Sequence, residues 1–148
     1  MNYRRAAMDD IDRLIDLRKL QLLDEGIEPA INIDTELHQF FLQKLEDGSL
    51  IQWVAEEKEE IIACGAVIFY DFPPSYTNKT GKRAYITNMY THENFRGQGI
   101  ATHLLKKLVE ESKEAGVTKM WLGASNLGRP VYQKFGFKET DEYLELNL

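Results

Sequence analysis

Two glycines separated by one residue stand between a strand-like segment and a long helical pattern. The segment reads Arg96-Gly97-Gln98-Gly99-Ile100-Ala101. Glycines at the start of a helix leave backbone N–H groups unobstructed, and the positive end of the helix dipole lies at the same place. The arginine adds a permanent positive charge. This combination predicts a binding site for a diphosphate or a similarly concentrated anion.

The glycine loop departs from two well-known nucleotide-binding signatures. It lacks the Gly-Lys-Ser/Thr ending of a P-loop, and Thr102 stands where the third glycine of the dinucleotide-binding pattern would be. Folds that bind nucleoside triphosphates or dinucleotides are therefore disfavoured. A plain turn between a strand and a helix remains an alternative on this motif alone.

Apolar spacing predicts the elements that carry this loop. Helices are expected over residues 9–24, 34–47, 97–115 and 129–135, and strands over 51–55, 61–70, 83–91, 117–124 and 137–148. The first two strands should form an antiparallel hairpin, and the strand–helix–strand unit over 84–124 requires a right-handed parallel crossover. The predicted fold is α/β, a single domain with a mixed sheet flanked by helices.

Composition restricts the class of protein. The 148 residues fit one domain, 43% of them are hydrophobic and 28% are charged. No apolar run approaches about eighteen residues, and residues 1–14 lack the apolar core of a signal peptide, so a soluble cytoplasmic protein without membrane contact is expected. The net charge of −6 argues against a nucleic-acid partner. Cys64, the only cysteine, lies in an apolar run and is expected to be a buried structural thiol.

Two separate motifs resemble those of the GNAT superfamily of N-acetyltransferases. Residues 88–105 look like its acetyl-CoA motif, whose core is Gln/Arg-x-x-Gly-x-Gly/Ala, and residues 96–101 match every fixed position. Residues 124–137 resemble its second signature, a short helix that carries a tyrosine and is followed by Gly-Phe. The predicted order of elements also resembles the family over nearly the whole chain, although the N-terminal third is the least diagnostic part.

The resemblance implies an acetyl-CoA-dependent N-acetyltransferase that needs no metal. An amine, on a small molecule or a peptide, would attack the thioester directly in a ternary complex. The implied binding residues for the pyrophosphate are Arg96, Gly97, Gln98, Gly99, Ile100 and Ala101. Main-chain groups of Met89 and Thr91 would receive the pantetheine arm and the thioester carbonyl. A sensor domain that binds coenzyme A without turnover is the alternative, and a homodimer is possible because family members are often dimers.

The short helix supplies the other residues implied by the resemblance. Tyr132 matches the tyrosine that can protonate the leaving thiolate, and its ordinary pKa of about 10 lies above the roughly 8.5 of a thiol. Asn126 matches a position that contacts the coenzyme A chain, and Arg129 adds charge beside it. The alternatives are that Tyr132 only packs, and that Asn126 and Arg129 only cap or solvate the helix.

The sequence does not name the base that deprotonates the amine. Some family members carry a glutamate at the positions of Asn88 or Tyr90, and neither residue is a carboxylate. An ordered water or a distant acid must then serve, with Glu25 and Glu28 as candidates. Four aromatic residues surround the Pro73-Pro74 loop and could line an acceptor pocket: Tyr70, Phe72, Tyr76 and Tyr85. The alternative is that Tyr70 and Tyr85 are cross-strand partners in the sheet.

Overall fold

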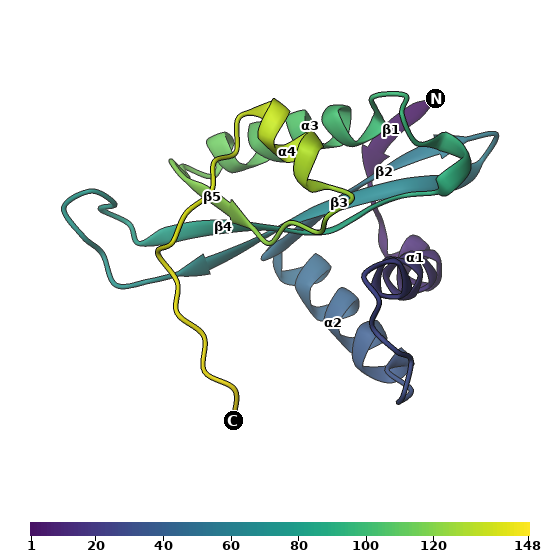
Figure 1. Cartoon of the computed structure of the whole chain (residues 1–148), viewed down its shortest axis with the longest axis horizontal. Helices are drawn as coiled ribbons and strands as arrows, with labels where there is room; N and C mark the ends of the chain where they lie inside the picture. The colour runs from purple at the N-terminus through teal and green to yellow at the C-terminus, as the bar shows by residue number, and fades with distance from the viewer.

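One five-stranded sheet forms the centre of the molecule, and the computed structural model describes all 148 residues. The elements in chain order are β1 (Asn2–Arg5), η1 (Met8–Asp10), α1 (Ile11–Asp24), α2 (Asp34–Asp47), β2 (Leu50–Glu57), β3 (Glu60–Asp71), β4 (Lys82–Thr91), η2 (Glu93–Phe95), α3 (Ile100–Glu114), β5 (Met120–Leu122) and α4 (Arg129–Phe135). The helices lie in two layers: α1 and α2 cover one face of the sheet, and α3 and α4 cover the other (Figure 1).

The sheet is mixed and has the strand order β1-β2-β3-β4-β5. The first four strands pair antiparallel, and β4 pairs with β5 in parallel. The predicted hairpin and the predicted parallel crossover are therefore both confirmed, as is the α/β mixed sheet. None of the helices combines the length and the apolar composition that a membrane span requires.

The two faces of the sheet hold separate cores. On the α1/α2 face, Leu14 and Leu17 of α1 and Phe41 of α2 pack against β2 and β3. On the α3/α4 face, Leu105 and Leu108 of α3 belong to the second core, over β3 and β4. β3 is buried from residue 61 to residue 67, as expected for a central strand that is covered on both sides.

The C-terminal strand predicted over residues 137–148 is wrong. Residues 138–148 form no backbone–backbone hydrogen bond, and Leu144 and Leu146 are exposed at 101% and 83%. Their alternating pattern suits a strand, but a strand forms only where another edge accepts its hydrogen bonds. After α4 the chain does not return to the sheet but runs past β5 as an extended tail (Figure 1).

The N-terminal strand β1 was not predicted, because four mostly polar residues carry no apolar alternation. Polar contacts hold it in place. Arg4 binds the carboxylates of Asp10 and Glu56, and Arg5 binds Glu111 of α3. β1 therefore ties an edge of the sheet to both helical layers through charge, and the Tyr3 ring adds apolar contact by stacking on His103 of α3 with 3.8 Å between the ring centroids.

Candidate active site

β4 and β5 pair over only three residues and then separate. Their register runs from Ala84 opposite Met120 to Ile86 opposite Leu122. β4 continues to Thr91, so its second half has no strand beside it on the β5 side. On the other side, β4 is bulged against β3, and Asn88 adopts a left-handed conformation with φ of 55°. The strand edge thus opens where the chain approaches the glycine loop.

Buried polar side chains hold the bulge in position. The Cys64 thiol donates to the carbonyl of Asn88 at 3.2 Å, and the Asn88 amide donates to Oε1 of Gln52 at 3.3 Å. Burial raises the pKa of Cys64 to about 12, so this thiol stays protonated and unreactive. A Cβ atom on Gly65 would overlap the sulfur of Met89. Glycine at position 65 therefore leaves room for the Met89 side chain to point toward α3 while the Met89 backbone stays at the opening.

A cavity of about 1010 Å³ fills the opening, and we call it the main cavity. It lies between the second half of β4, the glycine loop, the segment that follows β5, and the C-terminal end of α1. Nine of the eleven predicted site residues line it: Met89, Thr91, Arg96, Gly97, Gly99, Ile100, Ala101, Asn126 and Tyr132. The side chains of Gln98 and Arg129 do not. The structure thus brings together two motifs that lie about thirty residues apart in the sequence.

The glycine loop presents a run of free amides. Gly97 and Gly99 have φ of 78° and 80°, which glycine adopts without strain, and α3 accordingly begins at Ile100 rather than at the predicted Gly97. None of the amides of residues 97–102 donates to a carbonyl. The first amide of the helix that does so is that of His103, which donates to the carbonyl of Gly99. Six consecutive N–H groups at the positive end of a fifteen-residue helix therefore remain available to an anion.

The Arg96 side chain braces this loop. Its Nε donates to the carbonyl of Thr91 at 2.9 Å, and its Nη2 binds the carboxylate of Asp24 on α1 at 2.7 Å. The guanidinium also lies over the ring of Tyr90, with 5.7 Å between Cζ and the ring centroid. Arg96 thus links the end of β4 to α1, and its charge is shared with Asp24 instead of standing free at the loop.

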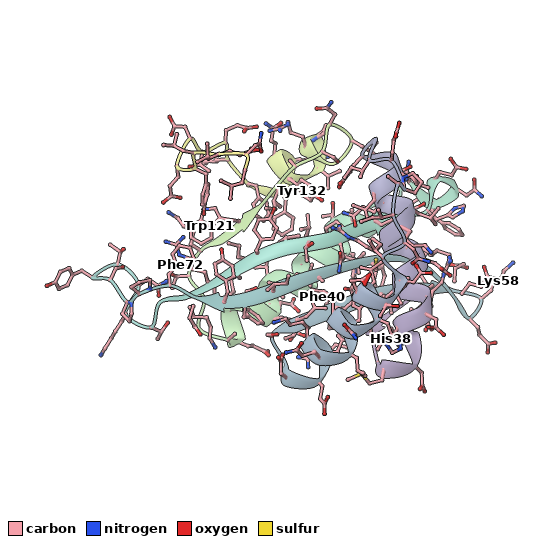
Figure 2. All side chains as sticks on the ribbon, turned by 90° about the horizontal axis from the view of Figure 1, so that it is seen from below. His38, Phe40, Lys58, Phe72, Trp121 and Tyr132 are labelled. Carbon is pink, nitrogen blue, oxygen red and sulfur yellow. The ribbon has the colours of Figure 1, made fainter.

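Tyr132 reaches the centre of the site from the short helix α4. Figure 2 shows its ring pointing from α4 toward the middle of the sheet. Glycine at position 128 makes room for it, because a Cβ there would come within 2.8 Å of the ring. Burial, with smaller contributions from Glu25 and Tyr85, raises the pKa of Tyr132 to about 12. The hydroxyl has no hydrogen-bond partner within the chain, so it is a protonated and unoccupied donor.

The residues beside Tyr132 divide into two groups. Asn126 lines the main cavity, as do Ser125 and Gly128. Arg129 instead pairs with the carboxylate of Glu139 and donates weakly to the carbonyl of Ala124 at 3.4 Å. The structure therefore places Asn126 where a bound chain would pass, and it directs the charge of Arg129 toward the C-terminal segment.

A second, smaller cavity of about 300 Å³ adjoins the first, and we call it the side cavity. Six residues line both cavities: Gln21, Glu25, Met89, Gly123, Ser125 and Tyr132. Of the two candidate bases, Glu25 lies at this junction and Glu28 lines neither cavity. Sequence reasoning missed Arg18 and Gln21 of α1. Their only signal was their spacing: Gln21 follows Arg18 by three residues and Glu25 follows Arg18 by seven, which places all three along one helix face.

Of the aromatic residues predicted around the Pro73-Pro74 loop, only one lines either cavity. Tyr85 lines the side cavity, whereas Tyr76 is fully exposed at the tip of its loop. Tyr70 lies opposite Arg83, and Tyr85 opposite Ile68, so the two tyrosines are diagonal rather than direct partners across the sheet. The guanidinium of Arg83 lies over the ring of Phe72, with 3.8 Å between Cζ and the ring centroid.

Comparison with known proteins points to the same family as the two sequence motifs. A family model described as the acetyltransferase (GNAT) family matches residues 14–137. An uncharacterized N-acetyltransferase of Methanocaldococcus jannaschii is 27% identical over 93% of this chain, which spans 61% of that protein's length. The uncharacterized N-acetyltransferase YsnE of Bacillus subtilis is 22% identical over 91% of the chain and 88% of its own length.

Two solved structures cover almost the whole chain. One is a predicted acetyltransferase with acetyl-CoA from Clostridium acetobutylicum, with 58% identity and a TM-score of 0.96 over 99% of this chain and 95% of that one. The other is a GCN5-related N-acetyltransferase from Ralstonia eutropha, with 26% identity and a TM-score of 0.90 over 99% and 97%.

Proposed function

Because the chain belongs to the acetyltransferase (GNAT) family, we propose that it transfers an acetyl group from acetyl-CoA to an amine. One observation carries the proposal: the amides of residues 97–102 are free, and five of these six residues line a cavity of about 1010 Å³ that Tyr132 also lines. An anion-binding helix start and a proton donor thus share one continuous space. That arrangement suits a long substrate with a diphosphate at one end and a reactive thioester at the other.

The chain's own residues fit such a substrate. The amides of residues 97–102 receive the pyrophosphate, and Asn126 and the segment beside it contact the chain that leads inward. The second half of β4, freed from β5, offers main-chain groups of Met89 and Thr91 to the pantetheine arm and the thioester carbonyl. A backbone N–H aimed at this carbonyl oxygen stabilises the charge that develops there during attack.

The transfer is a single exchange of bonds at the acetyl carbon. The amine nitrogen forms a bond to this carbon with its lone pair, and the bond from carbon to sulfur breaks with its electrons on the sulfur. The amine nitrogen loses one proton, and coenzyme A leaves as the thiolate, which takes up a proton from water once it has left the site. Glu25 is the carboxylate that lines both cavities, so we assign it the amine proton.

Tyr132 stabilises the leaving sulfur by donating a hydrogen bond. With its pKa raised to about 12, against about 8.5 for a thiol, full proton transfer from the hydroxyl to the thiolate costs about 5 kcal/mol. A hydrogen bond to the thiolate carries no such cost and is strengthened by the charge of the sulfur. The role of Tyr132 therefore shifts from the outright acid of the sequence prediction toward a donor that remains a tyrosine at the end.

The test joins binding with turnover on one preparation. Calorimetry measures the affinity for acetyl-CoA, and release of free thiol is followed over a panel of amines. Binding with thiol release that depends on an amine supports the proposal. Binding without release on any amine favours a sensor that holds coenzyme A, and absence of binding overturns the assignment of the main cavity.

A further inference from the structure

The side cavity has a charged wall that the transfer reaction itself does not require. Arg18 lines this cavity and not the main one. It forms no ion pair and has one side-chain hydrogen bond, from Nη1 to Oε1 of Gln21 at 3.1 Å. The guanidiniums of Arg4, Arg5, Arg96 and Arg129, by contrast, each bind a carboxylate. A half-buried guanidinium without a counter-charge is costly, because part of its hydration is lost.

Glu25 lies at the opposite end of the same cavity wall. It follows Arg18 by seven residues, so two helical turns separate their Cα atoms by about 10 Å. Gln21 stands between them, accepting from Arg18 and donating from Nε2 to Oε1 of Glu25 at 3.4 Å. The positive and negative groups are therefore held apart by one amide side chain and do not neutralise each other directly.

The two charged groups lie at different distances from Tyr132: Glu25 is beside it and Arg18 is farther away. Glu25 and Tyr132 line the junction of the two cavities, where the acetyl carbon must lie for transfer. Arg18 lies beyond that junction, with Tyr85 and Thr87 of β4 on the facing wall. A bound acceptor thus places its amine at Glu25 and its far end at Arg18.

We propose that the acceptor is a small amine that also carries an anionic group, which Arg18 binds. This inference rests on the proposed acetyl transfer and names its substrate class. A volume of about 300 Å³ equals that of about ten water molecules, which suits a small molecule. A carboxylate and a phosphate share the chemistry that a guanidinium recognises. A polyamine brings a second cation toward Arg18 and is disfavoured by repulsion.

The test compares amines that differ only in the anion. L-leucine is paired with 3-methylbutylamine, O-phosphoethanolamine with ethanolamine, and spermidine serves as the polycation. We expect kcat/KM for at least one anionic amine to exceed that of its neutral partner by about ten- to a hundredfold, the size of a charge-assisted hydrogen bond. Which pair shows the preference distinguishes a carboxylate from a phosphate.

Two variants of α1 separate recognition by Arg18 from general electrostatics. Arg18→Gln is expected to lower the ratio of anionic to neutral kcat/KM at least tenfold, and Arg18→Lys to restore part of it. Lys19→Gln removes the neighbouring charge, which pairs with Asp34 and lines neither cavity, so the ratio should hold. Calorimetry with acetyl-CoA on each variant reports whether the fold and the main cavity are intact.

Each outcome decides between the two proposals. Acetyl-CoA binding with turnover only on neutral amines or on spermidine overturns this inference and leaves the acetyl transfer standing. The same holds if Arg18→Gln keeps its preference, or if no anionic amine binds by calorimetry to the enzyme saturated with coenzyme A. Absence of acetyl-CoA binding overturns the proposed function itself.

Discussion

Replacing Tyr132 with phenylalanine tests the central step of the mechanism. The substitution removes one hydroxyl and keeps the ring that packs against Phe137 and against the backbone of residue 128. Because the hydroxyl has no partner within the chain, its loss should change the free energy of unfolding by less than about 1 kcal/mol. The affinity for acetyl-CoA should also hold, since the loop amides that receive the pyrophosphate are unchanged.

The expected cost falls on the chemical step. A hydrogen bond from the hydroxyl to a developing thiolate is worth about 1.5–3 kcal/mol, which corresponds to about a ten- to hundred-and-fiftyfold slower rate. Single-turnover kinetics with saturating acetyl-CoA measure this rate without product release. Tyr70→Phe is the matched control, because it removes a hydroxyl from a half-buried tyrosine that lines neither cavity.

The pH dependence sharpens the same prediction. A tyrosine whose pKa is raised to about 12 keeps its proton at every pH below that value, so its ionisation cannot cause a fall in rate below about pH 11. The rate should rise toward the pKa of the amine, about 10.4, as more of the amine loses its proton. Tyr132→Phe should lower the whole profile without displacing it. A normal single-turnover rate in the variant, or a lost basic limb near neutral pH, refutes the reasoning.

Three further predictions follow from other contacts of the site. Arg96→Ala removes the brace between Thr91 and Asp24, and it should weaken acetyl-CoA binding by about three- to tenfold by calorimetry; unchanged affinity contradicts the role of this residue in shaping the pyrophosphate site. Gly65→Ala drives a Cβ into Met89 and should lower the unfolding free energy by about 1–3 kcal/mol in urea, whereas a variant as stable as the parent refutes that packing. Cys64 should resist thiol reagents in the folded protein at about pH 8 and react on unfolding; rapid labelling of the native protein disproves its burial.

Local patterns predicted the parts of the site that are local in sequence. The loop of residues 96–101 and the helix that carries Tyr132 could be predicted because a few adjacent residues determine a helix start or a short helix. The wall formed by Arg18, Gln21 and Glu25 could not. It comes within reach of Tyr132 only through the packing of α1 on the sheet, and more than a hundred residues separate the two in sequence.

The errors in the predicted fold also arise because contacts between residues far apart in the sequence were not visible in local patterns. The tail after α4 carries the alternation of a strand, but alternation does not say whether another strand lies beside it. β1 shows the converse, since pairing with β2 and three charged contacts make a strand from residues without a recognisable pattern. Burial of a polar group such as Asn88 was also invisible, because the partners that satisfy it come from β2 and β3.

The bulge at Asn88 reverses the parity of β4. Before it, odd-numbered Tyr85 and Thr87 lie opposite Ile68 and Ala66 of the α1-side core, while Ala84 and Ile86 belong to the core under α3. After it, Met89 packs toward α3, and Tyr90 joins the core on the α1 side. The strand therefore behaves as two half-strands in different reading frames, joined by one residue. Deleting Asn88 would restore unbroken alternation along the strand, so Met89 and Tyr90 would keep the faces that they occupy now. A chain of 147 residues would then keep both layers, but it would lose the left-handed residue whose carbonyl accepts the Cys64 thiol and which interrupts the regular pairing of β4 at the opening.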